Sequence, residues 1–120
     1  MYKPISFLLL LHLTYSCSKP VDQQLLNAIN NSSTIEAGVY KDGGSVGIML
    51  VDEKGVNYIT IWVPADNKNT YILTNDINST KGVRKELNSK TKNLLAELIK
   101  DKNTSGNSDY VISALLNNKK

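Results

Sequence analysis

The chain offers few side chains that could act as nucleophiles, bases or metal ligands. It has one histidine, His12, and one cysteine, Cys17, and both lie in or beside an apolar run near its start. If that run is removed as a signal, the mature protein has no imidazole, which excludes a Ser-His-Asp or Cys-His mechanism and a zinc site of imidazole or thiolate ligands. A serine-lysine pair or paired carboxylates remain. We expect no cofactor.

Four acidic residues in or beside predicted turns are the candidates for paired carboxylates. They are Asp52, Glu53, Asp66 and Asp76. Asp52 and Glu53 are adjacent, while Asp66 and Asp76 flank a predicted strand with no evident partner. Solvated turn residues are the favoured interpretation. An enzyme that uses carboxylate or lysine chemistry is the alternative.

A segment rich in side-chain oxygens lies between the two predicted C-terminal helices. Asp101, Asn103, Ser105 and Asp109 occupy positions one, three, five and nine of a pattern that has Gly106 at position six. The pattern resembles the start of an EF-hand calcium loop. It departs from that loop at Ser108 and at Ile112, where the bidentate glutamate belongs, so it predicts only weak calcium binding. The favoured interpretation is a helix-to-helix turn without a metal, in which Ser108 caps the next helix.

Aromatic side chains gather on one face of the predicted sheet. Strand alternation places Tyr40, Tyr58 and Trp62 together, and Tyr71 joins them if the register permits. Aromatic residues are enriched at recognition surfaces, but they also form cores. If the helices pack on this face, the aromatic residues are core. If the helices cover the side of Ile59, Ile61 and Val63, the aromatic face is the candidate partner-binding surface.

The first residues have the pattern of a targeting signal. Lys3 supplies a positive n-region, and residues 5–13 supply an apolar h-region. The apolar run ends before Cys17, whereas a membrane-spanning helix needs ~20 apolar residues. We therefore expect a removable signal.

The end of this signal, Leu13-Thr14-Tyr15-Ser16-Cys17, resembles the lipobox of bacterial lipoproteins. The resemblance implies that residues 1–16 are cleaved off and that Cys17 carries a lipid anchor in the cell envelope. Ser18 after the cysteine suggests the outer membrane more than the inner one. Thr14 and Tyr15 depart from the usual pattern. The alternative is an ordinary secretory signal and a secreted or periplasmic protein.

Behind the signal we expect a short tether, residues 17–21, and a single α+β domain, residues 22–120. Apolar spacing predicts a short helix over residues 22–29, capped by Asp22. Four strand-like runs follow at residues 34–40, 45–51, 56–63 and 70–74, and the turn residues between them predict an antiparallel meander. Two C-terminal helices, residues 81–102 and 109–116, should pack on the sheet. The second and third strands are apolar on both sides, so both faces of the sheet should be covered, at least in the middle, and helices should supply most of that cover.

The charge balance weighs against a nucleic-acid partner. The formal charge is +3, and removing Lys3 with the signal leaves 13 basic and 11 acidic residues. Lys81, Lys85, Lys92 and Lys100 follow one side of the long predicted helix, either as a solvated face or as a face toward anionic lipid. We expect a non-enzymatic, membrane-anchored envelope lipoprotein that binds a protein or peptide, with an inhibitor or immunity protein as one version. A weak calcium-responsive module is a further alternative.

Overall fold

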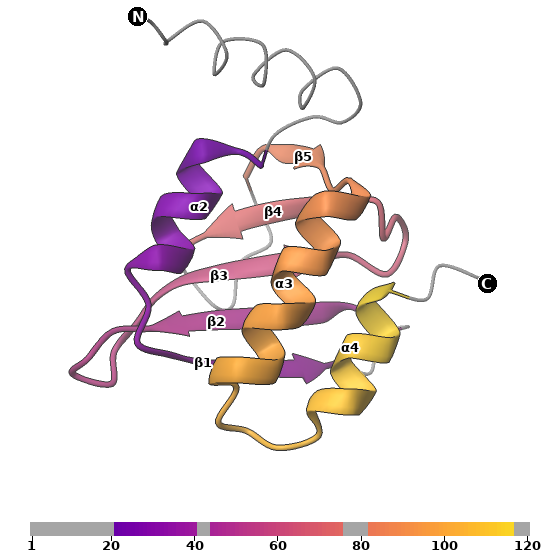
Figure 1. The fold of residues 1–120 in the computed structure, drawn as a ribbon. Coiled ribbons are helices and arrows are strands. Elements are labelled where there is room, and N and C mark those ends of the chain that lie inside the picture. Colours follow the sequence, from indigo (N-terminus) through magenta and orange to yellow (C-terminus); the bar gives the residue numbers. More distant parts are fainter. Residues whose placement is uncertain (1–20, 41–43, 76–81, 117–120) are drawn as a thin grey trace, which may run out of the picture.

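The structure is a computed structural model, and it describes residues 21–40, 44–75 and 82–116. In this part of the chain a five-stranded antiparallel sheet packs against three helices, so the predicted α+β class is confirmed. Figure 1 shows the three helices on one face of the sheet. The predicted signal, Cys17 and most of the tether lie outside the described residues.

No helix within the described ranges has both the length and the apolar character needed to cross a membrane.

Each strand of the sheet pairs with the next one in the sequence. The strands are β1 (Thr34–Val39), β2 (Val46–Val51), β3 (Asn57–Val63), β4 (Thr70–Thr74) and β5 (Arg84–Glu86). All four pairings are antiparallel. The predicted meander is confirmed, with the first four strands within one residue of their expected bounds, but the prediction of four strands misses β5.

The segment before the long helix is a strand instead of a helical turn. Arg84 pairs with Ile72 of β4, and the backbone N–H of Leu87 donates to the carbonyl oxygen of Asn69 at 2.7 Å. The prediction of a helix beginning at residue 81 is therefore wrong. The spacing of Val83 and Leu87 fits one side of a helix, but in the structure Val83 is 74% exposed and Leu87 is buried.

The long helix, α3 (Ser89–Lys102), is capped by Asn88, whose Oδ1 accepts a hydrogen bond from the Thr91 N–H at 2.9 Å. The predicted lysine face does not form along it. Lys85 lies in β5, and Lys92 is only 6% exposed and donates from Nζ to Asn69 Oδ1 at 2.9 Å.

The first described helix, α2 (Gln23–Asn30), begins where the sequence predicts. Asp22 Oδ1 accepts from the N–H groups of Gln24 at 2.8 Å and Leu25 at 3.3 Å, so the predicted cap is confirmed. Asp22 Oδ2 accepts from Lys85 Nζ at 2.9 Å. One carboxylate therefore begins the helix and ties it to the edge strand β5.

The core lies between the sheet and α2, α3 and α4 (Ser108–Leu116). Its fully buried members include Leu25, Ile48, Leu50, Ile61, Val63, Leu95, Ile99 and Leu115. The helices therefore cover the side of the sheet that carries Ile61 and Val63. The expectation of helices on both faces is wrong for the described part of the chain. Two residues of the opposite face are nevertheless buried, since Thr60 is 0% and Val51 is 7% exposed.

A β-bulge interrupts the alternation of β3. Leu50 pairs with Ile59, but the next residue, Val51, pairs with Asn57, so Tyr58 is an additional residue in β3. The Tyr58 hydroxyl donates to the carbonyl oxygen of Ala28 in α2 at 2.7 Å. Tyr58 therefore lies on the helix side of the sheet.

Candidate functional site

The four aromatic residues proposed as a partner surface lie on two different faces. Tyr71 is 2% exposed and belongs to the core beneath the helices, and Tyr58 packs against that core. Tyr40 and Trp62 lie on the opposite face, which no described helix covers. The structure therefore separates the predicted group into two core residues and two candidates for binding.

Tyr40 and Trp62 form an aromatic pair whose ring centroids are 5.3 Å apart and whose planes are tilted by 54°. Two glycines make room for the rings. Gly38 and Gly47 are cross-strand partners in β1 and β2, and Gly47 also pairs with Trp62. A Cβ at Gly47 would lie 2.7 Å from Tyr40 Cε2 and 3.1 Å from Trp62 Cζ3. The rings thus lie directly over the strand backbone, and the missing side chain at Gly47 sets their position.

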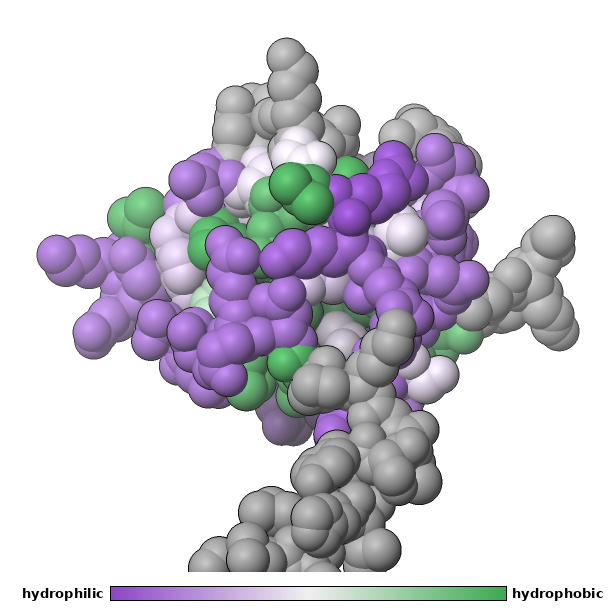
Figure 2. Space-filling view, turned by 90° about the horizontal axis from the view of Figure 1, so that it is seen from above, coloured by the Kyte–Doolittle hydropathy of each residue, from purple (hydrophilic) through white to green (hydrophobic). Residues whose placement is uncertain are grey.

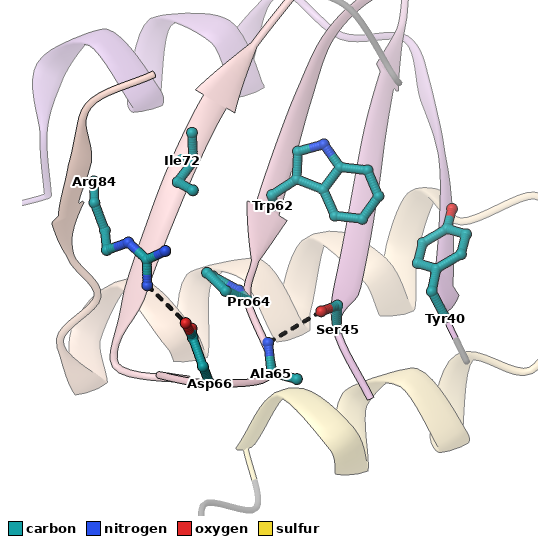
Figure 3. A pocket seen from close by; sticks show the side chains of 8 residues that line it. All are labelled: Tyr40, Ser45, Trp62, Pro64, Ala65, Asp66, Ile72 and Arg84. Atoms are coloured by element: carbon teal, nitrogen blue, oxygen red, sulfur yellow. Dashed lines mark hydrogen bonds and ion pairs between the residues drawn. The ribbon is translucent and has the colours of Figure 1, made fainter. Parts of the chain in front are cut away.

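Next to this pair the structure has a pocket of about 470 Å³. It is lined by Tyr40, Ser45, Trp62, Pro64, Ala65, Asp66, Ile72 and Arg84. Figure 3 shows Tyr40 and Arg84 at its two ends, with Trp62, Pro64 and Ile72 between them. The lining is apolar and aromatic in the middle, with polar groups at one end, which is the usual composition of a ligand site.

An ion pair forms the polar end of the pocket. Arg84 Nη1 lies 3.1 Å from Asp66 Oδ1, and the two side chains are 43% and 73% exposed. Exposed ion pairs of this kind contribute only ~0–1 kcal/mol to stability. Both charged groups can therefore form hydrogen bonds to a ligand at little cost to the stability of the fold.

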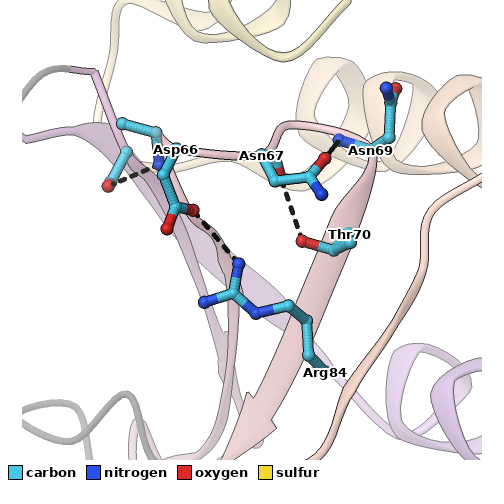
Figure 4. Close-up of polar contacts among 7 residues, drawn as sticks. Asp66, Asn67, Asn69, Thr70 and Arg84 are labelled. Carbon is cyan, nitrogen blue, oxygen red and sulfur yellow. Dashed lines mark hydrogen bonds and ion pairs between the residues drawn. The ribbon is translucent and has the colours of Figure 1, made fainter.

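The loop that carries Asp66 is held at both ends. The Ala65 N–H donates to Ser45 Oγ at 3.0 Å, which fastens the start of the loop to the residue before β2. At the other end, the Asn69 N–H donates to Asn67 Oδ1 at 3.0 Å and Thr70 Oγ1 donates to the Asn67 carbonyl oxygen at 2.9 Å (Figure 4). These bonds fix the loop, so Asp66 faces Arg84 from a defined position.

Large hydrophobic side chains are otherwise rarely exposed in the described residues. Those that are exposed are Tyr40, Val56, Val83, Tyr110 and Leu116. Figure 2, seen from the end that carries α2 and β5, shows mainly hydrophilic residues with the hydrophobic ones in small separate groups. Only Tyr40 among the exposed hydrophobic residues lines the pocket.

The other carboxylates proposed for catalysis do not meet in a cleft. Asp52 Oδ1 accepts from the N–H groups of Lys54 and Val56, both at 2.9 Å, as expected of a turn residue. Glu53 is exposed. Asp66 has a partner, Arg84, which the sequence did not reveal, and Asp76 lies outside the described residues.

The segment that resembles a calcium loop, residues 101–109, packs against the edge strand β1 of the sheet. Asn103 Oδ1 accepts from the Ala37 N–H of β1 at 3.0 Å, and Ser105 Oγ donates to the Ala37 carbonyl oxygen at 2.9 Å. Thr104 donates from its N–H to the Ile35 carbonyl oxygen at 2.9 Å. Two of the predicted ligand oxygens therefore bond to the strand. Asp101 lies in α3 and Asp109 in α4. Within the described ranges no group of three or more His, Cys, Asp or Glu is placed to hold a metal.

Several groups with a shifted pKa lie on the helix side of the sheet, away from the pocket. Burial, with a smaller effect of the Asp22 charge, raises the pKa of Tyr71 to about 12. Burial also raises the pKa of Tyr58 and, together with the charge of Lys68, lowers the pKa of Lys92. The hydrogen bond from Lys85 lowers the pKa of Asp22. These shifts follow from packing and capping in the core layer.

Sequence reasoning missed most of the pocket. Arg84 and Ile72 come together only because β5 pairs with β4, and that strand was not predicted. The sequence places Ser45 at a strand end and Pro64 in a loop with no role, and it offers Asp66 only as a turn residue or a catalytic carboxylate without a partner. The one available signal was that Arg84 is the only arginine in the chain.

Comparison with known proteins gives no relative for this arrangement: no protein-family model, no curated protein and no solved structure matches the chain.

Proposed function

We propose that the domain is a non-enzymatic binding module of a small envelope lipoprotein and that it recognises a protein or peptide partner on the face of Tyr40 and Trp62. The observation that carries this proposal is the aromatic pair, fixed over Gly47 beside a pocket of about 470 Å³. Tyrosine, tryptophan and arginine dominate the energetics of protein interfaces, and all three line this pocket.

The geometry favours binding because the aromatic side chains are already ordered before a partner binds. Tyr40 is 36% exposed although its ring packs against Trp62, so it offers contact area without first having to become ordered. Aromatic rings that cover a strand glycine also serve stability alone. The adjoining pocket and the exposed Asp66–Arg84 pair support the binding role, since stability of the sheet requires neither.

A lipid anchor at Cys17 would hold this surface near the membrane. Val21 already packs against the core, so only four peptide units separate it from Cys17. An extended chain advances at most ~3.6 Å per residue, which limits this link to roughly 14 Å. Such a short link suits a partner in or near the same membrane, and Ser18 favours the outer membrane over the inner one. An inhibitor or immunity protein is one version of this role.

The distribution of reactive groups supports a binding role over an enzymatic one. Beyond residue 17 the chain has no histidine and no cysteine. Asp52 is engaged in its turn, and Glu53 and Asp66 are exposed, so no described pair of these carboxylates shares a buried cleft. An active site normally perturbs such groups by burial.

Two experiments test the proposal. Purified chain should capture a specific partner from envelope extract, and Tyr40→Ala and Trp62→Ala should each weaken the capture while Tyr110→Ala, an exposed tyrosine in α4, should not. Equal capture by all three variants would contradict the proposed surface. Labelling with a fatty acid in wild type and Cys17→Ala tests the anchor, and equal label in both would remove the lipoprotein part of the proposal.

A further inference from the structure

The pocket crosses the whole sheet, perpendicular to the strands. Tyr40 follows β1 at one end and Arg84 lies in β5 at the other (Figure 3). Four strand spacings of about 4.8 Å separate these two strands, so the pocket extends roughly 19 Å. An extended peptide advances about 3.3 Å per residue, and some six residues therefore match this length.

The Arg84 end of the pocket can donate several hydrogen bonds. A guanidinium has five N–H donors, and within the described residues Arg84 makes one contact, from Nη1 to Asp66 Oδ1 at 3.1 Å. Because this exposed, single contact is weak, a second carboxylate can share or replace it. Arginine binds carboxylates through two parallel hydrogen bonds, which neither a lysine nor a neutral side chain reproduces.

The neighbouring wall is apolar. Ile72 and Pro64 lie between Arg84 and Trp62 in Figure 3, and Ile72 is 4% exposed. Arg84 and Trp62 stand on strands two spacings apart, about 10 Å. Ile72, the cross-strand partner of both, lies between them, so it forms an apolar floor on which one ligand side chain can rest next to a carboxylate at Arg84.

We infer that the pocket binds a peptide of about six residues through a carboxylate held by Arg84, with the adjacent apolar side chain packed on Ile72 between Arg84 and Trp62 and the remaining residues directed toward Tyr40. This inference rests on the proposed function and names the chemistry of its partner. The carboxylate comes either from the C-terminus of a polypeptide or from an aspartate or glutamate side chain.

Three synthetic probes separate these sources. The first is an N-acetylated hexapeptide of glycine and serine that ends in leucine and phenylalanine with a free carboxylate. The second is its C-terminal amide. The third is also a C-terminal amide, but a glutamate is inserted after the phenylalanine, so that its only carboxylate is a side chain. Trp62 is the only tryptophan in the chain and lines the pocket, so its fluorescence reports binding to the full chain directly.

We expect a carboxylate-bearing probe to bind about tenfold more tightly than the plain amide, in keeping with a partly exposed charged hydrogen bond. Arg84→Gln should abolish this preference. Lys100→Gln, which removes an exposed positive charge from α3, should leave it unchanged. Preference for the first probe identifies a C-terminus, and preference for the third identifies an acidic side chain.

The opposite results are equally clear. Equal binding of all three probes, or a preference that survives Arg84→Gln, overturns the carboxylate inference. So does the absence of binding by every probe while capture of the native partner still depends on Tyr40 and Trp62, and in that case the proposed function stands. Capture that is independent of both aromatic residues overturns the proposed function itself.

Discussion

Gly47→Ala tests whether the aromatic rings lie on the strand as described. A Cβ at this position would lie 2.7 Å from Tyr40 Cε2, closer than real Cβ contacts, and 3.1 and 3.3 Å from two atoms of the Trp62 ring. Overpacking of this kind costs ~1–3 kcal/mol. Without the rings, alanine would instead gain ~0.5–1 kcal/mol over glycine inside a strand. The two cases therefore predict changes of opposite sign.

Gly38→Ala is the matched control. Gly38 is the cross-strand partner of Gly47, but a Cβ there would meet Tyr40 only at an ordinary contact distance of 3.6 Å. We expect Gly38→Ala to be neutral or stabilising and Gly47→Ala to lower the free energy of unfolding by up to about 2.5 kcal/mol, which is the overpacking cost less the strand gain. For a domain of this size each 1 kcal/mol shifts Tm by roughly 4–8 °C.

Urea denaturation followed by Trp62 fluorescence measures both variants. Tyr40→Ala in the Gly47→Ala background should recover part of the loss, because it removes the nearest atom; coupling between contacting residues is typically ~0.5–3 kcal/mol. If Gly47→Ala stabilises the protein as much as Gly38→Ala does, the rings do not lie over the strand, and the candidate site loses its basis.

Three further predictions concern the framework of the fold. Asp22→Ala should cost ~1 kcal/mol at pH 7 through loss of the helix cap. Because the hydrogen bond from Lys85 lowers the pKa of Asp22, this difference from wild type should be complete above the unfolded pKa of about 4 and shrink as the pH falls through the lower folded value, which a series of urea denaturations at decreasing pH would show. The Tyr71 hydroxyl is buried with no hydrogen-bond partner in the described residues, so Tyr71→Phe should be at least as stable as wild type at pH 7, and a large loss of stability in this variant would contradict the unpaired hydroxyl. Because burial raises the folded pKa of Tyr71 to about 12, wild type should lose more stability than Tyr71→Phe between pH 10 and 12. Asn103→Ala should cost ~1–2 kcal/mol because it removes the hydrogen bonds to the Ala37 N–H and to the Gly106 carbonyl oxygen, and leaves the Ala37 N–H only the longer contact of 3.3 Å to Ser105 Oγ. Millimolar calcium should not raise Tm of wild type, since Asn103 and Ser105 already bond to β1, and a clear calcium-dependent increase would restore the calcium module.

The sequence predicts the central part of the fold well, where periodicity is strict. Helix α2 with its Asp22 cap and the first four strands follow from apolar spacing and turn residues. Strand alternation predicts a free aromatic face if the helices cover the Ile61 side, and the structure meets this condition for Tyr40 and Trp62. Alternation alone sufficed there because β1 and the end of β3 are regular.

The errors have local causes. Tyr58 lies on the helix side of the sheet, and not on the predicted aromatic face, because the β-bulge adds one residue to β3. The alternation of apolar and polar residues in the sequence does not reveal such a bulge. Strand β5 was missed because three residues at an edge carry too little periodicity, and the flanking Val83 and Leu87 fit a helix. The pocket was missed with it, since Arg84 reaches Asp66 only through the pairing of β5 with β4.

Site-specific photocrosslinking tests the central claim most directly. A benzoylphenylalanine placed at Tyr40 keeps an aromatic ring beside Trp62, and the same residue at Tyr110 provides an exposed control in the helix layer. Irradiation in the native envelope should give one discrete adduct from position 40 and none from position 110. The absence of an adduct at position 40, or the same adducts from both positions, would contradict the account of the Tyr40–Trp62 face as the partner-binding surface.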